Sequence, residues 1–567
     1  MVESNDSIID NYFGAKKFES LRKGSKPGPH HPAHRRIASQ HVTDFFKMGL
    51  SSVPKDLRSS ELIPTRMSSH YPMMNSSFTS KPIVESSQDM EVEPKKLNFD
   101  GTKDEKPSQP EPQQPTPKKE EKSYKINLEW KKYLNDDGII SDTWSFQNWD
   151  KSSFPGDAQI EKDISRTRTE IPVMKQTEVR KRLRDLAAFY CILNSVDYQQ
   201  GLCEIIAPFL LLKSTVFRTA DCFAYLNSFM RNYFTAILTP KKFGKKNELP
   251  HLQTAYKYCD LIIQYHCAEL SQLFKMRNID IRMFATSWIM TLFIQGTPID
   301  FVYEILDQYI QRSDKTFFFY LVVALLKFGE ERIFNLANEK EETILLKFLN
   351  MNMKNELLTG IDQIRAWFRL ADGIKATTPK SFEVALRNLG FMGDNFMSAE
   401  NWQELLSSAK INILYVFPAE AVNFIIEHTA MTTDERKKFG SCYDREIEFR
   451  FLDIRRTKEK GFLPFSVEVP SKVYKDQLLL QKYLTAAASY DKAAHICIMR
   501  TNNKDETEGK LAQVFIEQLM LNNKNCVSVL YGGFQGILRE VEKRKVNIEL
   551  FQKESSGFFG AFGRLFG

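Results

Sequence analysis

The chain changes character near residue 123, and this boundary limits what the remainder can fold into. Thirteen of the 23 prolines fall between Pro27 and Pro117, together with five of the nine histidines. A segment this rich in Pro, Ser and Lys, without sustained apolar periodicity, cannot bury enough surface to offset its ordering entropy. We therefore predict a disordered tail over residues 1–123. It is either an arm that binds partners through short motifs or a solvated leader without a specific partner.

Helical periodicity begins after this tail. Val179, Leu183, Leu186 and Tyr190 recur with a spacing close to 3.6 residues, and charged residues stand between them, which is typical of an amphipathic helix. Similar patterns cover residues 202–213, 219–236, 251–274, 280–294, 299–311, 315–327, 331–348 and 360–373. We expect an all-α, two-lobed domain over residues 124–385.

A third kind of sequence begins near residue 400. Short runs rich in β-branched and aromatic residues occur at 411–417, 449–452, 495–499 and 527–530, and a helical pattern covers 510–521. Strands that alternate with helices favour a parallel sheet with crossover helices. We predict an α/β domain over residues 400–548, followed by a Phe/Gly-rich tail at 549–567.

Charge and hydropathy exclude several classes of protein. Lys and Arg number 78 and Asp and Glu 71, a net charge of +7 over 567 residues, which is too small for a dedicated nucleic-acid binder. The longest apolar runs, at 205–212 and 317–326, are shorter than the roughly 20 residues of a membrane span, and no secretory signal is expected. The eight cysteines form no C-x-x-C pair, so we expect reduced thiols, no metal site and no cofactor.

Two short motifs lie about 35 residues apart in the helical domain. The first follows the pattern I-x-x-D-x-x-R-T over residues 160–167, and the second follows Y-x-Q-G-L over residues 198–202. An Arg guanidinium stays charged and offers forked donors to phosphate oxygens, and a carboxamide can both accept from and donate to a water molecule. Alternatively, Arg166 is a solvated surface residue among charged neighbours, and Gln200 is a helix N-terminal residue without chemistry.

These motifs resemble the TBC domain of Rab GTPase-activating proteins. Trp130, the segment 284–293 and the Leu306-Asp307 dipeptide add to the resemblance. The resemblance implies that Arg166 is an arginine finger, Gln200 a glutamine finger and Asp163 the carboxylate that holds the arginine loop. It also implies that Tyr198 and Gly201 shape the glutamine turn, and that the partner is a GTP-bound GTPase of the Rab family.

The α/β domain resembles rhodanese domains through L-D-I-R at 452–455, G-F-L-P at 461–464 and Y-G-G-F at 531–534. In an active rhodanese a Cys opens the loop after the central strand. Here Arg500 follows the predicted strand, and Asp505, Glu506 and Glu508 would repel an anion. We expect no sulfurtransferase activity and interpret the domain as an inactive rhodanese-like spacer or docking surface.

A TBC domain followed by an inactive rhodanese-like domain resembles a group of membrane-trafficking proteins. The resemblance implies endosome-to-Golgi transport, a golgin-type tether as partner, and a cytoplasmic protein peripheral to the trans-Golgi network and endosome-derived vesicles. Two functions stay open: a Rab GTPase activator that uses Arg166 and Gln200, or a non-catalytic scaffold that binds golgins or vesicle proteins.

Overall fold

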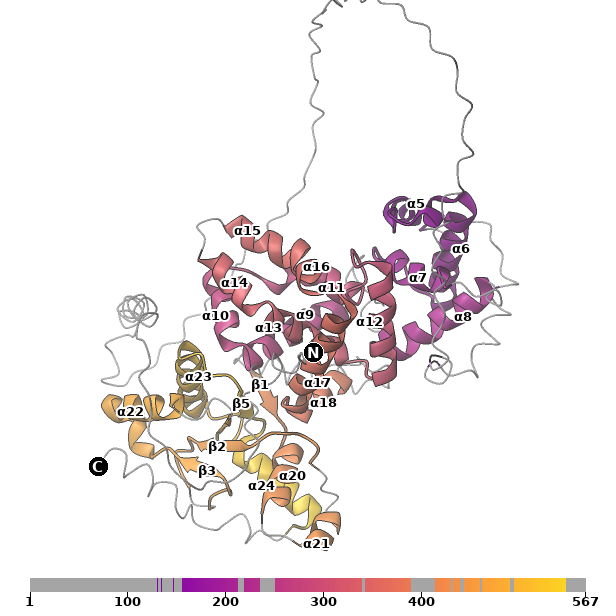
Figure 1. Ribbon diagram of the computed structural model, residues 1–567. Coiled ribbons are helices and arrows are strands. Elements are labelled where there is room, and N and C mark those ends of the chain that lie inside the picture. Colours follow the sequence, from indigo (N-terminus) through magenta and orange to yellow (C-terminus); the bar gives the residue numbers. More distant parts are fainter. Residues whose placement is uncertain are drawn as a thin grey trace, which may run out of the picture. The chain divides into compact units, whose positions relative to one another are not determined.

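The computed structural model of the chain describes residues 156–212, 219–234, 250–338, 342–388, 413–429, 432–438, 443–458, 461–489 and 494–546, together with Trp130, Leu134 and Phe146. The predicted tails at 1–123 and 549–567 lie outside the described residues. The described chain begins with helices and continues into a part built on a parallel sheet (Figure 1). None of its helices combines the length and hydropathy that crossing a membrane requires.

The first helices whose bounds the structure describes carry both predicted motifs. They are α5 (Asp157–Arg166), η3 (Pro172–Lys175), α6 (Thr177–Asn194), α7 (Leu202–Leu210), α8 (Thr219–Phe229) and η4 (Met230–Phe234). Ser195 ends α6 with a left-handed φ of 52°, and Gly201 starts α7 with a φ of 100°. These two turns set the path of the short loop that carries the second motif.

A larger set of helices follows. They are α9 (Pro250–His266), α10 (Ala268–Met276), η5 (Ile281–Met283), α11 (Thr286–Met290), α12 (Ile299–Arg312), α13 (Phe317–Phe328), α14 (Glu330–Ala337), α15 (Glu342–Lys347), η6 (Phe348–Asn352), α16 (Met353–Leu357), α17 (Ile361–Ala376) and α18 (Lys380–Asn388). Tyr303 on α12 donates to the carbonyl oxygen of Pro208 on α7 at 2.8 Å, so the two sets are in direct contact.

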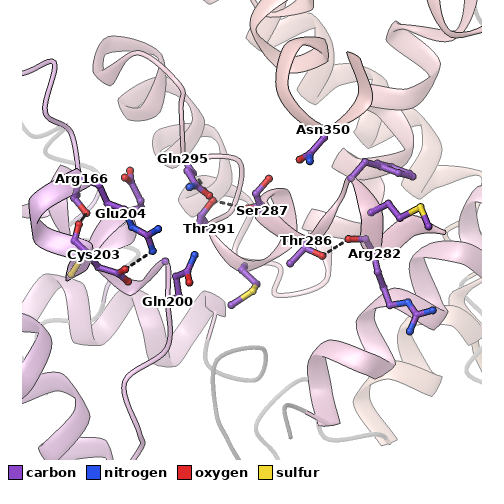
Figure 2. A pocket seen from close by; sticks show the side chains of 16 residues that line it. Arg166, Gln200, Cys203, Glu204, Arg282, Thr286, Ser287, Thr291, Gln295 and Asn350 are labelled. Atoms are coloured by element: carbon purple, nitrogen blue, oxygen red, sulfur yellow. Dashed lines mark hydrogen bonds and ion pairs between the residues drawn. The ribbon is translucent and has the colours of Figure 1, made fainter. Parts of the chain in front are cut away.

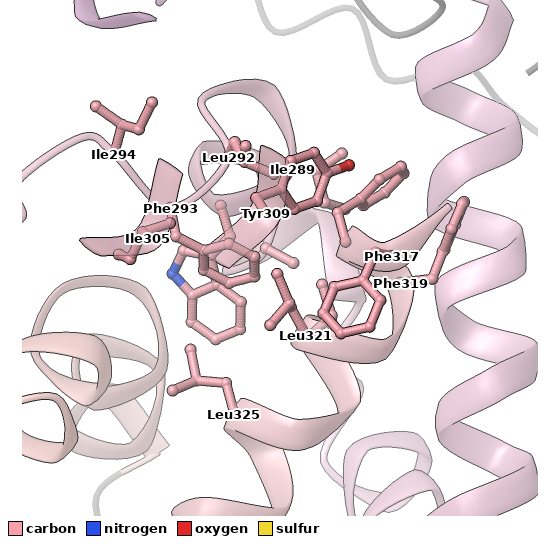
Figure 3. Close-up of a cluster of buried hydrophobic side chains, with 14 of the residues drawn as sticks. Ile289, Leu292, Phe293, Ile294, Ile305, Tyr309, Phe317, Phe319, Leu321 and Leu325 are labelled. Carbon is pink, nitrogen blue, oxygen red and sulfur yellow. The ribbon is translucent and has the colours of Figure 1, made fainter. Parts of the chain in front are cut away.

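The core of the helical part is built around α13, which is buried from Phe317 to Leu326 (Figure 3). A helix that is apolar on all sides needs neighbours on all sides. On one side, the indole of Trp367 donates to the carbonyl oxygen of Leu321 at 3.0 Å. The Trp367 ring also packs edge-on against Phe293, with ring centroids 4.9 Å apart. Phe293 belongs to the 291–297 turn, which is thereby anchored in the core.

The second part is a five-stranded, all-parallel sheet. Its strands are β1 (Leu414–Val416), β2 (Phe449–Asp453), β3 (Ser466–Glu468), β4 (His495–Met499) and β5 (Val527–Leu530), in the order β1-β5-β4-β2-β3. Helices α20 (Pro418–His428) and α24 (Gly533–Arg544) share one apolar cluster with Cys497 and Met499, whereas α22 (Gln477–Ala488) and α23 (Glu506–Leu521) share another with Ile496 and Ile498. Successive residues of β4 thus face opposite layers, as strand geometry requires.

The remaining short elements are α21 (Thr433–Lys438) and η7 (Ser471–Tyr474). The predicted classes are confirmed at this level, because a helical region precedes a region with a parallel sheet. Strands β1, β2, β4 and β5 occur where the sequence predicts them, and helix α23 begins four residues before its predicted start. The sequence analysis missed β3, which has three residues.

Three predicted continuous helices are wrong. The 331–348 helix is instead α14, which ends at Ala337, and α15, which begins at Glu342. The 251–274 helix breaks at Cys267, whose φ of −137° is not helical, and the following N–H of Ala268 donates to Asn525 Oδ1 at 2.8 Å. The 280–294 helix is instead η5, α11 and an irregular turn in which Leu292 and Phe293 have φ values of 48° and 60°. An apolar periodic pattern does not reveal left-handed residues of this kind, because they are held by tertiary contacts.

Candidate functional site

Arg166 is the last residue of α5 and extends from the first motif into solvent. Its side chain is 58% exposed, and Nη2 lies 2.5 Å from Asp163 Oδ1. Asp163 stands one turn earlier on the same helix, with a side chain only 3% exposed. The other oxygen of Asp163 accepts from the Tyr198 hydroxyl at 2.7 Å. One buried carboxylate therefore holds the exposed guanidinium and also ties the two motifs together.

Gln200 stands at the turn that opens α7. It is exposed and is followed by Gly201, the N-cap residue of α7. The backbone φ of Gly201 is 100°, which side chains disfavour, and an added Cβ would lie 3.1 Å from Thr291 Cγ2, so this turn favours glycine.

Tyr198 does not line the pocket described below. Burial raises the pKa of its hydroxyl, so that group stays a neutral donor to Asp163.

A pocket of about 570 Å³ brings the predicted residues together. Asp163, Arg166, Gln200 and Gly201 all line it. Figure 2 shows Arg166 and Gln200 at one end of this pocket, with Ser287, Thr291 and Gln295 next to them, and Arg282 and Asn350 at the far end. The guanidinium at the end of α5 and the carboxamide in the turn before α7 thus face one pocket.

Sequence reasoning missed three charged residues at this pocket: Glu204, which lines it, and Arg168 and Lys354, which do not. Arg168 Nε lies 3.0 Å from Glu204 Oε2, and the Arg168 side chain is only 2% exposed. Lys354 on α16 is also buried and donates to the carbonyl oxygen of Phe293 at 3.0 Å. A charge within an otherwise apolar helical segment could have suggested Glu204, whereas no local pattern singles out Arg168 or Lys354.

The arrangement fits phosphoryl transfer on a partner. A GTPase hydrolyses GTP slowly because charge on the transferring phosphoryl group is poorly stabilised, and an Arg inserted from another protein raises the rate by about 10³–10⁵. An exposed Arg166 held from behind by Asp163 can present its free N–H groups to phosphate oxygens. An exposed Gln200 can orient a water molecule.

The sheet has its own candidate site, where the loop after β4 meets the start of α23. Here the carboxylate of Glu508 is almost fully buried. It accepts from the Thr501 N–H at 2.5 Å, the Thr501 hydroxyl at 2.7 Å and the Arg456 N–H at 2.9 Å. Glu508, one of the three carboxylates predicted to repel an anion, therefore accepts the hydrogen bonds that this loop could otherwise donate to an anion.

The neighbouring crevice between β4 and β5 is closed by backbone contacts. The N–H groups of Phe534 and Gln535 donate to the carbonyl oxygens of Arg500 at 2.8 Å and Thr501 at 3.1 Å. A Cβ at Gly533 would lie 2.3 Å from the Arg500 carbonyl oxygen. In open parallel sheets ligands bind at this edge, where successive helices depart to opposite faces, and here protein atoms fill that position.

Residues that the sequence singled out in the sheet part, Asp453, Arg455 and Cys497, are buried there. Asp453 and Arg455 form a buried ion pair, with Asp453 Oδ2 and Arg455 Nη2 2.7 Å apart. The Arg455 guanidinium also stacks over the Phe534 ring at 3.8 Å. Cys497 is fully buried in β4, and burial raises its pKa to about 12, as expected of a core residue and not of a nucleophile.

The helical part of the chain is similar to a known protein family. Residues 121–334 match the model of the Rab-GTPase-TBC domain. The GTPase-activating protein GYP5 of Eremothecium gossypii is 30% identical over 200 residues, which is 35% of this chain and 22% of that protein. The GTPase-activating protein gyp2 of Schizosaccharomyces pombe is 24% identical over 246 residues, 43% of this chain and 32% of that protein. The chain therefore spans less than a third of either curated relative.

A solved structure is also similar. The crystal structure of the Ypt/Rab-GAP domain of Gyp1p matches with a TM-score of 0.36 and 16% identity, covering 43% of this chain and 85% of that one. The family match includes both motifs and all five predicted site residues, and it ends within α14. The helical part of the chain therefore contains a Rab-GTPase-TBC domain at residues 121–334.

Proposed function

We propose that the protein activates a Rab-family GTPase, with Arg166 as the residue that stabilises charge on the transferring phosphoryl group and Gln200 as the residue that orients water. Asp163 and Tyr198 hold Arg166, and Gly201 permits the turn that presents Gln200. No cofactor of its own is needed, because the GTP is bound by the partner.

One observation carries this proposal. Arg166 and Gln200 come from motifs 35 residues apart and line the same pocket, and both side chains are exposed. A purely structural Arg would use its donors within the protein, as Arg168 does. The GTPase-activating relatives GYP5 and gyp2 support the same class of partner.

The decisive experiment is single-turnover GTP hydrolysis by a panel of Rab proteins in the presence of the full chain. With the Rab protein that wild type accelerates, Arg166→Ala should lower the acceleration by at least about 100-fold. Gln200→Ala should lower it by about 10–100-fold, within the range of a single positioned group.

Arg182→Ala is the matched control. Arg182 is an Arg of similar exposure, 50%, paired with Glu178 on α6, and it does not line the pocket. Its replacement should leave the acceleration within about twofold of wild type. Acceleration that survives Arg166→Ala, or a full panel without any acceleration by wild type, would remove the enzymatic proposal.

We further propose that the sheet part is an inactive rhodanese-like domain and that the protein acts in endosome-to-Golgi transport, peripheral to the trans-Golgi network and endosome-derived vesicles, with a golgin-type tether as a second partner. The parallel strand order and the Glu508-filled loop support the first point. The proposed location and the golgin-type partner are tested by imaging the tagged full chain in cells and by measuring its binding to purified golgin segments. Diffuse cytosolic signal and no capture would contradict them.

The alternative is a non-catalytic scaffold. It is favoured by the filled crevice between β4 and β5, where the close approach at Gly533 and the buried Glu508 leave no room for a ligand. A scaffold predicts normal retrograde transport in cells that carry Arg166→Ala with Gln200→Ala. Impaired transport in that double variant, with normal abundance and position of the protein, would exclude it.

A further inference from the structure

Two residues beyond the exposed Arg166, the chain places a second arginine that is buried. The backbone turns at Arg168 with a left-handed φ of 51°, and the residue is 3% exposed. A non-glycine residue in this conformation and a buried guanidinium both cost free energy. Such a residue persists where surrounding contacts hold it, and those contacts are specific.

All three guanidinium nitrogens of Arg168 lie next to an oxygen atom, two of them in hydrogen bonds and Nε in an ion pair without hydrogen-bond geometry. Nη2 donates to the Ile294 carbonyl oxygen at 2.5 Å, Nη1 donates to the Thr297 carbonyl oxygen, and Nε lies 3.0 Å from Glu204 Oε2. The planar fork of Arg can serve three acceptors at once, which a Lys ammonium in the same place would not match in geometry.

The two ends of this contact set lie at the two motifs. Glu204 stands four residues after Gln200, in the first turn of α7. Arg168 stands two residues after Arg166, directly after the end of α5. The Arg168–Glu204 ion pair therefore links the segment that carries Arg166 to the helix whose start carries Gln200.

The 291–297 turn completes the link. Lys354 donates to the Phe293 carbonyl oxygen at 3.0 Å and also to that of Gln295. Thr291 of the same turn lines the pocket, and its methyl group lies 3.1 Å from where a Cβ of Gly201 would be. Arg168 and Lys354 thus hold the turn from behind, and the turn abuts the residue that presents Gln200.

We infer that Arg168, Glu204 and Lys354 are positioning residues that set the relative placement of Arg166 and Gln200. Burial and the neighbouring Arg168 lower the pKa of Lys354 to about 7, so Lys354 need not add a full positive charge beside Arg168. Glu204 also lines the pocket, and the three residues act on the rate indirectly, through the placement of Arg166 and Gln200. The inference rests on the proposed function for its kinetic test and on the geometry for a second test.

The kinetic test uses the full chain and a Rab protein that wild type accelerates. Arg168→Gln and Glu204→Gln should each lower kcat by about 10–100-fold and leave KM within about twofold, because a displacement of about 1 Å can cost 10²-fold. The double variant should lose about as much as either single variant, since both break one link. Arg312→Gln, which breaks the Arg312–Asp372 pair of 2.7 Å away from the pocket, should keep kcat.

The second test needs no GTPase. Backbone hydrogen exchange of the full chain should be at least about tenfold faster over 199–204 and 291–297 in Arg168→Gln, and unchanged over α17. If Arg168→Gln exchanges faster but wild type activates no Rab protein, the proposed function is wrong and the positioning role remains supported. Unchanged exchange, losses of kcat that multiply in the double variant, or a loss explained by a lower melting temperature would each overturn the inference.

Discussion

At the scale of single residues, the sequence identified the two motifs that meet at the pocket and missed the buried charged residues that connect them. Asp163, Arg166, Gln200 and Gly201 all line one pocket, and their roles in catalysis stay predictions. Arg168, Glu204 and Lys354 were missed because their pairing joins positions as far apart as 168 and 297. No local pattern encodes a contact of that kind.

Adding a side chain at Gly201 should destabilise the fold. Gly201→Ala forces a side chain into a φ of 100° and against Thr291 Cγ2 at 3.1 Å. It should lower the free energy of unfolding by about 1–3 kcal/mol and reduce GTPase activation. Gly296→Ala has a φ of 70° but nothing within 4 Å, so it should cost less and spare activation. Chemical denaturation of both variants checks this, and equal losses would rule out the contact with Thr291.

Lys354 allows a prediction about pH. Its pKa is lowered to about 7 in the fold, by burial and then by Arg168, with Glu204 acting in the opposite direction. The unfolded chain, with a Lys pKa of about 10.4, binds more protons between these values, so this residue makes stability rise with pH from about 7 upward. From pH 7 to 9 wild type should gain about 2 kcal/mol relative to Lys354→Met. Denaturation curves at both pH values measure the difference, and parallel behaviour of the two proteins would contradict it.

At the scale of elements, periodicity located most helices and strands but not their interruptions. Helix α12 spans Ile299–Arg312 where 299–311 was predicted, and β4 matches its predicted run. The break at Cys267 escaped prediction because an Asn525 side chain, more than 250 residues away, accepts the next N–H group. Left-handed Leu292 and Phe293 are similarly supported by contacts that no window of sequence contains.

The loop between β4 and α23 yields an element-scale prediction. Glu508→Ala removes the acceptor of the Thr501 and Arg456 N–H groups, which leaves buried donors unpaired. We expect a loss of about 2–4 kcal/mol in the free energy of unfolding. Glu506→Ala, an exposed carboxylate in the same first turn, should lose less than about 1 kcal/mol. Similar losses in both variants would mean that the stabilisation comes from negative charge at the start of α23 and not from the hydrogen bonds of Glu508.

At the scale of the whole molecule, helical and sheet residues meet in buried polar contacts. Tyr265 on α9 hydrogen-bonds to His495 Nδ1 at the start of β4. The carboxylate of Glu420 on α20 accepts from the Ser381 N–H at 2.7 Å, at the start of α18. Neither contact was predicted, because both pair residues from separate sequence regions. They imply that the stability of the two parts is coupled.

His495 makes this coupling testable by acid. Burial, followed by the nearby Lys524, lowers the His495 pKa to about 3. An unfolded His has a pKa of about 6.5, so the unfolded chain takes up the proton first and this residue's contribution to stability falls as pH drops from about 6.5 toward 3. Wild type should lose about 1 kcal/mol more than His495→Asn between pH 6.5 and 5.5. Urea denaturation at the two values decides, and an equal loss in both proteins would count against it.

The hydrogen bond from the Trp130 indole to Asp307 at 3.0 Å bears on how the protein can be dissected. Trp130 is buried, and its ring centroid lies 6.1 Å from that of Phe209 on α7. A truncated version starting at α5 would remove this donor from the Asp307 carboxylate, which would keep the Gln311 amide at 2.9 Å, and would remove the indole that packs against Phe209. Any shortened protein made for biochemistry therefore has to start upstream of Trp130, and not at Asp157, where α5 begins.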